Sequence, residues 1–460
     1  MDLNQIKGSG VEGLKFINSL VSIEPILKKF KIKPNKALGQ NFLRDNDVSK
    51  QIVDSFSLNE NDVLIEVGPG LGALTQYLVG RVKKLIVIEF DYRISEFLSI
   101  IFDGCDDVEI INEDAVKFDL RNYYLYGKIK VIGNLPYSSG SEIIRNFLTF
   151  PTPVSASVFM LQKEVAERYC AVPRTKSYGV NTVLIGSRWK VKNIFECDAS
   201  PFIPKPNVNS TVLKFELHDS NKYEPHNQNV LRKVLLSGFS ERRKQIRKRM
   251  NIGALSWDDV CDNLGIKTTA RSEELSIDQW IGMARLLDDN ELKDNPQSAE
   301  EIFDVVDMND FVIDQVDRNS VHRDKLIHRA VHIFILNRND EILLQKRSLL
   351  KDTCPGLWGS SASGHLDSGE EYEDAAIREL KEELGIVAKL NQVCKIEPSV
   401  NTGWEFVTLY KCEHNGPFSW PFSEVEDLGF FEIKMVSKWI EERPKDFSSG
   451  FIECFKSYSR

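Results

Sequence analysis

The sequence predicts an α/β protein of at least two domains, of which the first is built on a parallel, doubly wound sheet. Three observations lead to this prediction. The chain has 460 residues, more than one hydrophobic core normally serves. Four short apolar runs in its first third each end in a glycine, an acid or an amide. Residues 1–290 carry 39 Lys and Arg against 36 Asp and Glu, whereas residues 291–460 carry 20 against 32.

Composition indicates a cytoplasmic globular protein that acts as a monomer and has no membrane partner. Charged residues make up 28% of the chain, and no apolar run approaches the eighteen residues of a membrane span. Lys7, Glu12 and Lys15 interrupt what would be the apolar core of a secretory signal. The eight cysteines form no Cys-x-x-Cys pair, which argues against a zinc site or a disulfide scaffold.

The change in charge coincides with a polar segment that contains one proline, as linkers often do. We predict an N-terminal extension of unassigned role (residues 1–27), a first α/β domain (28–222) and a helical RNA-binding segment (223–288). A linker (289–299) and a second α/β domain (300–460) follow.

The first apolar run predicts a strand, a glycine turn and a helix over residues 62–75. Gly68, Gly70 and Gly72 let the backbone approach a ligand, and the helix N-terminus offers free N–H groups. Their Gly-x-Gly-x-Gly spacing differs from the dinucleotide-binding Gly-x-Gly-x-x-Gly pattern. The second strand ends at Glu89, where doubly wound folds bind ribose hydroxyls.

The third and fourth strands, over 108–112 and 128–133, bring further polar groups to the same sheet edge. Asp114 can accept a hydrogen bond from an adenine amine, or cap a helix. The fourth strand ends in Asn134-Leu135-Pro136-Tyr137. An amide, a carbonyl before a proline and a flat ring suit a planar amine taken out of its stack, such as N6 of adenine.

Aromatic and basic side chains supply the candidate contacts to a nucleic acid. Tyr137 and Phe202 lie in proline-punctuated loops and are predicted to stack on a flipped base, with packing in the core as the alternative. Charges spaced at helical intervals between residues 242 and 249 favour contacts with RNA phosphates, with a solvated helix face as the alternative. The RNA-binding candidates are Arg242, Arg243, Lys244, Arg247 and Lys248.

In the second part, two apolar strands around Asn339-Asp340 predict a hairpin. On the helix predicted further on, Glu379 lies three and four residues before Glu382 and Glu383, so these acids share one face. Clustered acids are usually a solvated surface, but they also suit Mg²⁺, which prefers hard oxygen ligands.

The motifs of the first part together resemble the ribosomal RNA adenine dimethyltransferases of the small subunit. The segments that carry this resemblance are 38–43, 66–72, Glu89, 113–115, 134–137, 160–168, 200–210, 238–248 and 271–276. The resemblance implies a Rossmann-like, S-adenosylmethionine-dependent methyltransferase with a small helical C-terminal subdomain. Its implied substrate is the small-subunit rRNA, or the pre-ribosomal small subunit, in which two adjacent adenosines become N6,N6-dimethyladenosine.

Carried over position by position, the resemblance assigns cofactor contacts to Asn41, Leu43, Gly68, Gly70, Glu89, Asp114 and Asn134. It assigns the methyl-transfer site to Asn134, Leu135, Pro136, Tyr137 and Phe202. The alternatives are a large-subunit adenine methyltransferase and a ribosome-assembly protein that binds RNA without turnover.

Residues 364–386 match the Nudix box completely. This resemblance implies an α/β/α sandwich that binds Mg²⁺ or Mn²⁺ through Glu379, Glu382 and Glu383, and hydrolyses a small diphosphate-linked substrate. Glu370 and Glu383 are the implied catalytic acids, and Arg378 orients them. Neighbouring segments resemble isopentenyl diphosphate isomerases, but Ser363 replaces the cysteine those enzymes carry before Gly-His. A module that only binds nucleotide or RNA is a further alternative.

Overall fold

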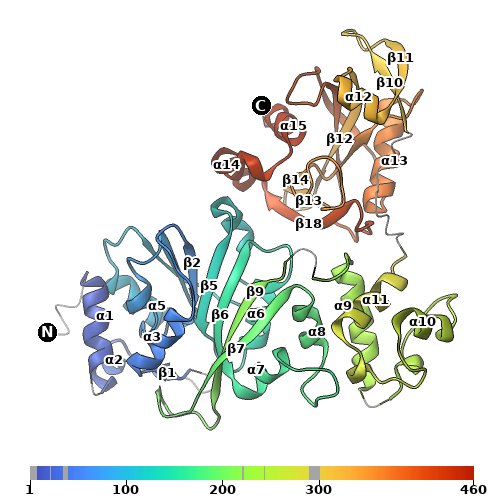
Figure 1. The fold of residues 1–460 in the computed structure, drawn as a ribbon. Helices are drawn as coiled ribbons and strands as arrows, with labels where there is room; N and C mark the ends of the chain where they lie inside the picture. Colours follow the sequence, from blue (N-terminus) through green and yellow to red (C-terminus); the bar gives the residue numbers. More distant parts are fainter. Residues whose placement is uncertain are drawn as a thin grey trace. The chain divides into compact units, whose positions relative to one another are not determined.

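The computed structural model describes residues 8–20, 22–34, 40–219, 222–242, 244–289 and 301–459 (Figure 1). The chain divides into two compact units, Met1–Glu224 with Gln228–Leu286, and Pro225–Asn227 with Leu287–Arg460. Within the described ranges, no helix combines the length and the apolar character that crossing a bilayer requires.

A seven-stranded sheet forms the centre of the first unit, in the order β4-β3-β2-β5-β6-β9-β7. Its strands are β2 (Val63–Val67), β3 (Lys84–Glu89), β4 (Val108–Asn112), β5 (Ile129–Asn134), β6 (Val154–Gln162), β7 (Trp189–Cys197) and β9 (Ser210–Leu217). The five strands from β4 to β6 are parallel, as predicted, whereas β9 pairs antiparallel with both β6 and β7. Strand β2 lies between β3 and β5, so the strand order reverses there, and ligands bind at such a point.

Alternate residues of the strands face two separate cores. Leu64 of β2 belongs to one hydrophobic cluster, while Ile65 belongs to the other, because successive side chains of a strand point to opposite faces. The first cluster receives α3 (Asn46–Asp54) and α5 (Tyr92–Ile101), and the second receives α6 (Gly140–Leu148) (Figure 1). The helices therefore cover both faces, which makes the unit the predicted Rossmann-like fold.

The N-terminal extension, to which the sequence assigned no role, contributes to this core. Its helices are α1 (Gly10–Ser19) and α2 (Glu24–Lys29). Leu14 is fully buried in the first cluster. The Arg44 guanidinium donates to the carbonyls of Ile17, Asn18 and Leu20 at 3.2, 3.3 and 2.6 Å, and so satisfies backbone acceptors at the C-terminal end of α1.

Two short segments far apart in the sequence form a separate ribbon. Strand β1 (Phe42–Leu43) pairs antiparallel with β8 (Phe202–Ile203), so that Leu43 lies opposite Phe202. The pairing fixes the chain just before α3, whose N-terminus is capped by Asp45: the carboxylate accepts from the N–H groups of Asp47 and Val48 at 2.9 Å.

The predicted helical segment contains α9 (Gln228–Gly238), α10 (Trp257–Leu264) and α11 (Ile277–Leu286). The basic stretch between α9 and α10 was expected to be helical, but its described residues form only turns, including the 3-10 turn Ile246–Lys248. Ile246 is fully buried, and the backbones of Gln245 and Arg271 form an isolated β-bridge. The stretch is therefore a loop that packs against the segment around Arg271.

The second unit is built on a mixed sheet in the order β14-β13-β12-β17-β16, with β15 paired to β12 and β18 paired to β13. The strands are β12 (His328–Leu336), β13 (Glu341–Arg347), β14 (Trp358–Gly359), β15 (Ala362–His365), β16 (Asn391–Ile396), β17 (Glu405–Glu413) and β18 (Val425–Glu432). Strands β12 and β13 form the predicted hairpin around Asn339-Asp340. A separate two-stranded ribbon joins β10 (Ile302–Val306) to β11 (Val312–Asp317).

Among the described residues of this unit, the α-helices that accompany the sheet are α12 (Arg318–Asp324), α13 (Tyr372–Leu384), α14 (Ile433–Glu442) and α15 (Ser449–Tyr458) (Figure 1). Helix α13 buries Leu380 and Leu384 against β12 and β15. It ends at Gly385, whose φ of 66° is the left-handed conformation typical of a helix C-terminus. The acids of the predicted cation site therefore lie on a helix that is fixed to the sheet.

Candidate functional site

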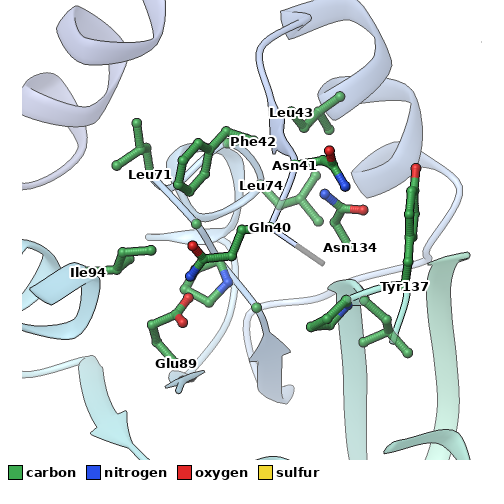
Figure 2. A pocket seen from close by; sticks show the side chains of 16 residues that line it. Gln40, Asn41, Phe42, Leu43, Leu71, Leu74, Glu89, Ile94, Asn134 and Tyr137 are labelled. Atoms are coloured by element: carbon green, nitrogen blue, oxygen red, sulfur yellow. The ribbon is translucent and has the colours of Figure 1, made fainter. Parts of the chain in front are cut away.

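A pocket opens at the carboxyl ends of β2, β3 and β5 in the first unit (Figure 2). Nine of the residues predicted to bind cofactor or to form the methyl-transfer site line it: Asn41, Leu43, Gly68, Gly70, Glu89, Asn134, Leu135, Pro136 and Tyr137. Its other lining residues, most of them apolar and none of them predicted from the sequence, are Gln40, Phe42, Pro69, Leu71, Ala73, Leu74 and Ile94. The pocket therefore has an apolar wall beside its polar groups.

The turn after β2 requires glycine at two positions, because of the backbone conformation there and because neighbouring atoms lie close to the backbone. Gly68 and Gly70 have φ values of 68° and 55°, which L side chains rarely adopt. A Cβ atom at Gly68 would lie 3.2 Å from the backbone oxygen of Asn134, and one at Gly70 would lie 3.1 Å from the ring of Phe42. The turn lets the backbone itself form part of the pocket wall.

Glu89 presents a buried carboxylate at one end of the pocket (Figure 2). Its side chain accepts a hydrogen bond from the N–H of Asp91 at 2.9 Å. Burial raises the pKa of Glu89 to about 7, with a smaller contribution from the charge of Asp91. A ligand that donates hydroxyl groups to this carboxylate would therefore favour its ionised form.

Asn41, Asn134 and Tyr137 lie together at the other end (Figure 2). Asn134 ends β5, and the next residue, Leu135, donates its N–H to the carbonyl of Met160 at 3.1 Å. The hydroxyl groups of Tyr137 and Ser210 are 2.7 Å apart, so a hydrogen bond holds the outer end of the tyrosine side chain in place. Burial raises the pKa of Tyr137, so its hydroxyl stays neutral.

Two predicted residues do not line this pocket. The Asp114 carboxylate accepts from the N–H of Val116 at 2.9 Å within a turn and caps no helix, because the next helix begins at Leu120; its contact with an adenine amine stays a prediction. Phe202 is 2% exposed and belongs to the core cluster, so the structure shows the core alternative for this ring. A proline-punctuated loop is equally compatible with a ring that stacks and a ring that packs.

Of the RNA-binding candidates, Lys244, Arg247 and Lys248 are exposed. Arg242 is instead paired with Glu273 at 2.7 Å and also donates to the carbonyl of Thr175, so it holds the local fold together. Arg243 lies outside the described residues.

In the second unit, α13 points its acids into a cavity of about 860 Å³. Glu379 and Glu383 are buried, whereas Glu382 is exposed. Glu383 accepts from the N–H of Ser363 at 3.0 Å and from the Gln345 amide at 3.2 Å. Burial raises the pKa of both Glu379, to about 8, and Glu383.

Arg378 joins the acids into one network. Its guanidinium donates two hydrogen bonds to Glu370, at 3.0 and 2.8 Å, and contacts Glu379 and Glu382 at 2.7 and 3.2 Å. A Cβ atom at Gly364 would lie 1.9 Å from the Glu379 carboxylate, so a larger residue there would displace this carboxylate. Buried carboxylates that repel one another and converge on a cavity fit a divalent cation with hard oxygen ligands.

The first unit thus has the sheet and the strand-end groups of an α/β methyltransferase, and the comparisons with known proteins give its family. The family model "Ribosomal RNA adenine dimethylase" matches residues 31–289, more than half of the chain. The chain belongs to this family of methyltransferases. The "NUDIX domain" model matches residues 326–450, so the second unit carries a Nudix domain.

Relatives match the methyltransferase part over nearly their whole length. The ribosomal RNA small subunit methyltransferase A of Clostridioides difficile is 31% identical over 279 residues, 59% of this chain and 96% of that protein. Its counterpart in Alkaliphilus oremlandii is 33% identical over 280 residues, 59% of this chain and 98% of that protein. A crystal structure of a dimethyladenosine transferase from Plasmodium falciparum covers 53% of this chain and 95% of its own, at 23% identity and a TM-score of 0.45.

Proposed function

We propose that the first unit binds S-adenosylmethionine and dimethylates N6 of two adjacent adenosines in small-subunit rRNA. The observation that carries the proposal is the pocket itself, which holds Glu89 at one end and Asn134 with Tyr137 at the other. The glycine turn and the apolar wall between them fit a nucleoside. The names of the relatives, which are small-subunit rRNA methyltransferases, support the choice of RNA.

In this proposal the pocket positions a poor nucleophile. The lone pair of an exocyclic adenine amine is delocalised into the ring, so the nitrogen must become pyramidal before it reacts. The Asn134 side-chain oxygen and the Leu135 carbonyl accept its hydrogens and favour that geometry, and Tyr137 stacks on the base. The cofactor supplies an electrophilic methyl group on sulfur. Glu89 binds its ribose, and Asp114 its adenine amine.

The test is methyl incorporation from labelled S-adenosylmethionine into small ribosomal subunits that lack these methyl groups. Asn134→Ala should reduce incorporation by about 100-fold or more, because it removes an acceptor that acts at the reacting nitrogen. Asn193→Ala, in exposed β7, is the matched control and should methylate normally. Normal methylation by Asn134→Ala would refute the role of Asn134. If the unmodified chain does not methylate the subunits either, an RNA-binding protein without turnover is favoured.

We further propose that the second unit hydrolyses a small diphosphate-linked compound with Mg²⁺ or Mn²⁺. Glu379, Glu382 and Glu383 would hold the cation, which polarises phosphoryl oxygens and lowers the pKa of water. Glu370 keeps Arg378 in place beside these acids. Arg347 and Lys351 line the same cavity and supply positive charge for the phosphates.

The full chain should be assayed with Mg²⁺ against nucleoside triphosphates, dinucleotide cofactors and isoprenoid diphosphates. Glu383→Gln should abolish turnover of whichever compound reacts, while Glu373→Gln, exposed on the same helix, should not. Unchanged turnover in Glu383→Gln would refute the assignment. Absence of any turnover, with Mg²⁺ still bound, would favour a binding module.

A further inference from the structure

The N-terminus of α15 opens into the cavity that the α13 acids line, and Ser448, Ser449 and Gly450 form part of its wall. The first hydrogen bond of the helix runs from the N–H of Ile452 to the carbonyl of Ser448, at 3.2 Å, and the Ser448 side chain makes no capping bond. Within the described residues, the N–H groups of Ser449 and Gly450 therefore have no acceptor. Free N–H groups and the helix dipole together attract anions to such an end.

A buried histidine adds a donor beside this helix end. His332 is 8% exposed and lines the same cavity, and a Cβ atom at Gly450 would lie 3.5 Å from its Nε2. Its Nδ1 is 2.6 Å from the hydroxyl of Ser360, whose proton has no other acceptor among the described residues. The hydroxyl therefore donates to Nδ1, and the ring proton is on Nε2, which has no partner in the same part of the chain. Burial lowers the pKa of His332 to about 4, so the ring is neutral.

Arg347 adds positive charge that no carboxylate pairs with in the described part of the chain. Its guanidinium donates to the carbonyl and the hydroxyl of Thr353, at 3.0 and 3.1 Å, which holds it at the cavity wall. By contrast, Lys351 is paired with Glu424 and lies 3.8 Å from Glu383. A guanidinium without a counter-ion at a cavity wall favours a bound anion.

These donors suit a phosphoryl group better than a carboxylate. Two backbone N–H groups, a serine hydroxyl, an imidazole N–H and a guanidinium come from α15, β12 and β13, and the first turn of α15 contains no acid. A phosphoryl group offers three oxygens to such a set, whereas a carboxylate offers two. We propose that the N-terminus of α15, His332 and Arg347 form a phosphate-binding subsite.

The subsite is distinct from the proposed cation site but close to it. Burial raises the pKa of Glu383, and the charges of Lys351 and Arg347 oppose that rise. The charge of Arg347 also contributes to the lowered pKa of His332, so this guanidinium acts on both sites. One ligand in the cavity can therefore reach the cation and the subsite together.

The identity of the substrate class rests on the proposed hydrolysis. If the cation binds the diphosphate that is cleaved, the subsite binds a further phosphoryl group of the same molecule. The substrate is then a nucleoside triphosphate, or a sugar diphosphate that also carries a phosphate ester. A diphosphate on an isoprenoid chain has no group for this subsite.

The first test is calorimetric titration of the full chain with inorganic phosphate in EDTA, which removes any cation that would itself bind phosphate. Gly450→Asp should weaken this binding at least about tenfold, because a carboxylate suits a helix N-terminus but repels phosphate there. Its Cβ atom would meet the His332 ring at 3.4 and 3.5 Å, which is ordinary contact. Asn391→Asp, exposed on β16, adds the same charge outside the cavity and should bind phosphate normally.

His332→Phe keeps a buried ring but removes the N–H, so it should also weaken phosphate binding, and it keeps the test valid if Gly450→Asp does not fold. The subsite is refuted if the unmodified chain binds no phosphate without a cation. It is equally refuted if phosphate binds Gly450→Asp and His332→Phe as tightly as the unmodified chain, since the phosphate then lies elsewhere.

Hydrolysis by the full chain with Mg²⁺ distinguishes the two substrate classes. A nucleoside triphosphate is compared with its diphosphate, and a phosphorylated sugar diphosphate with the same compound lacking the phosphate ester. In the class that reacts, the extra phosphoryl group should raise kcat/KM at least about tenfold, and Gly450→Asp should remove that difference. Equal rates within both pairs would refute the assigned substrate class. Phosphate binding without hydrolysis of any compound would confirm the subsite and contradict the proposed hydrolysis alone.

Discussion

The pKa of Glu89 predicts how the proposed cofactor binding depends on pH. Burial raises this pKa from 4.5 to about 7, and in the proposed complex the ribose hydroxyls donate to the ionised form. Below pH 7, binding must therefore first remove a proton, at a cost of about 1.4 kcal/mol for each pH unit. We expect the affinity to be about tenfold weaker at pH 6 than at pH 8, and level above pH 8.

The raised pKa of Glu89 also determines whether the folding stability of the protein rises or falls with pH. The folded state keeps a proton on Glu89 between pH 4.5 and about 7, whereas the unfolded chain loses it near 4.5. The contribution of Glu89 to the stability of the empty protein is thus present below pH 4.5 and is lost as pH rises through this window. A bound cofactor should offset that loss.

The assay is calorimetric titration of the full chain with S-adenosylhomocysteine from pH 5.5 to 8.5. Glu89→Gln should bind more weakly at pH 8 and show no pH dependence, because the group that titrates is gone. Glu96→Gln, exposed on α5, should keep the slope of the unmodified chain. An affinity that does not change with pH, or a slope that survives in Glu89→Gln, would refute the reasoning.

Three further substitutions test the fold and both sites. Gly70→Ala would hold an alanine in the left-handed backbone conformation, with its Cβ against the ring of Phe42. It should lower the free energy of unfolding by about 1–2 kcal/mol and weaken cofactor binding; unchanged values in urea unfolding and in calorimetric titration would contradict this. Leu14→Ala should lower the free energy of unfolding by about 2–5 kcal/mol in urea, and a loss below about 1 kcal/mol would show that α1 is not part of the core. Arg378→Lys loses the paired contact with Glu370 and should reduce any hydrolysis at least about tenfold, so equal rates would argue against its positioning role.

The ends of the central strands were predicted well, because an apolar run marks a buried strand and the glycine or acid that follows it marks where that strand ends. Glu89 and Asn134 could therefore be expected in one pocket from the order of the strands and their last residues. The stretch around Ile246 was predicted wrongly as helical, because the spacing of its charges carries no information on the burial of the isoleucine between them.

What the sequence could not show depends on contacts between distant segments. The burial of Phe202 follows from its pairing with Leu43, about 160 residues earlier. His328 and His365, whose ring centroids are 5.1 Å apart, meet because β12 pairs with β15, and His322 is brought beside them by α12.

The position of α1 has a consequence for shortened versions of the protein. The family match begins at residue 31, which suggests a natural starting point for a recombinant fragment. Such a fragment would lack Leu14, Ile17 and Ile26, all fully buried, and would expose the apolar surface beneath them. It would also leave Arg44 without the carbonyls it now binds, directly beside the strand that carries Leu43 into the pocket. Poor solubility or weak cofactor binding in that fragment would then reflect where it was cut, and not the chemistry of its pocket.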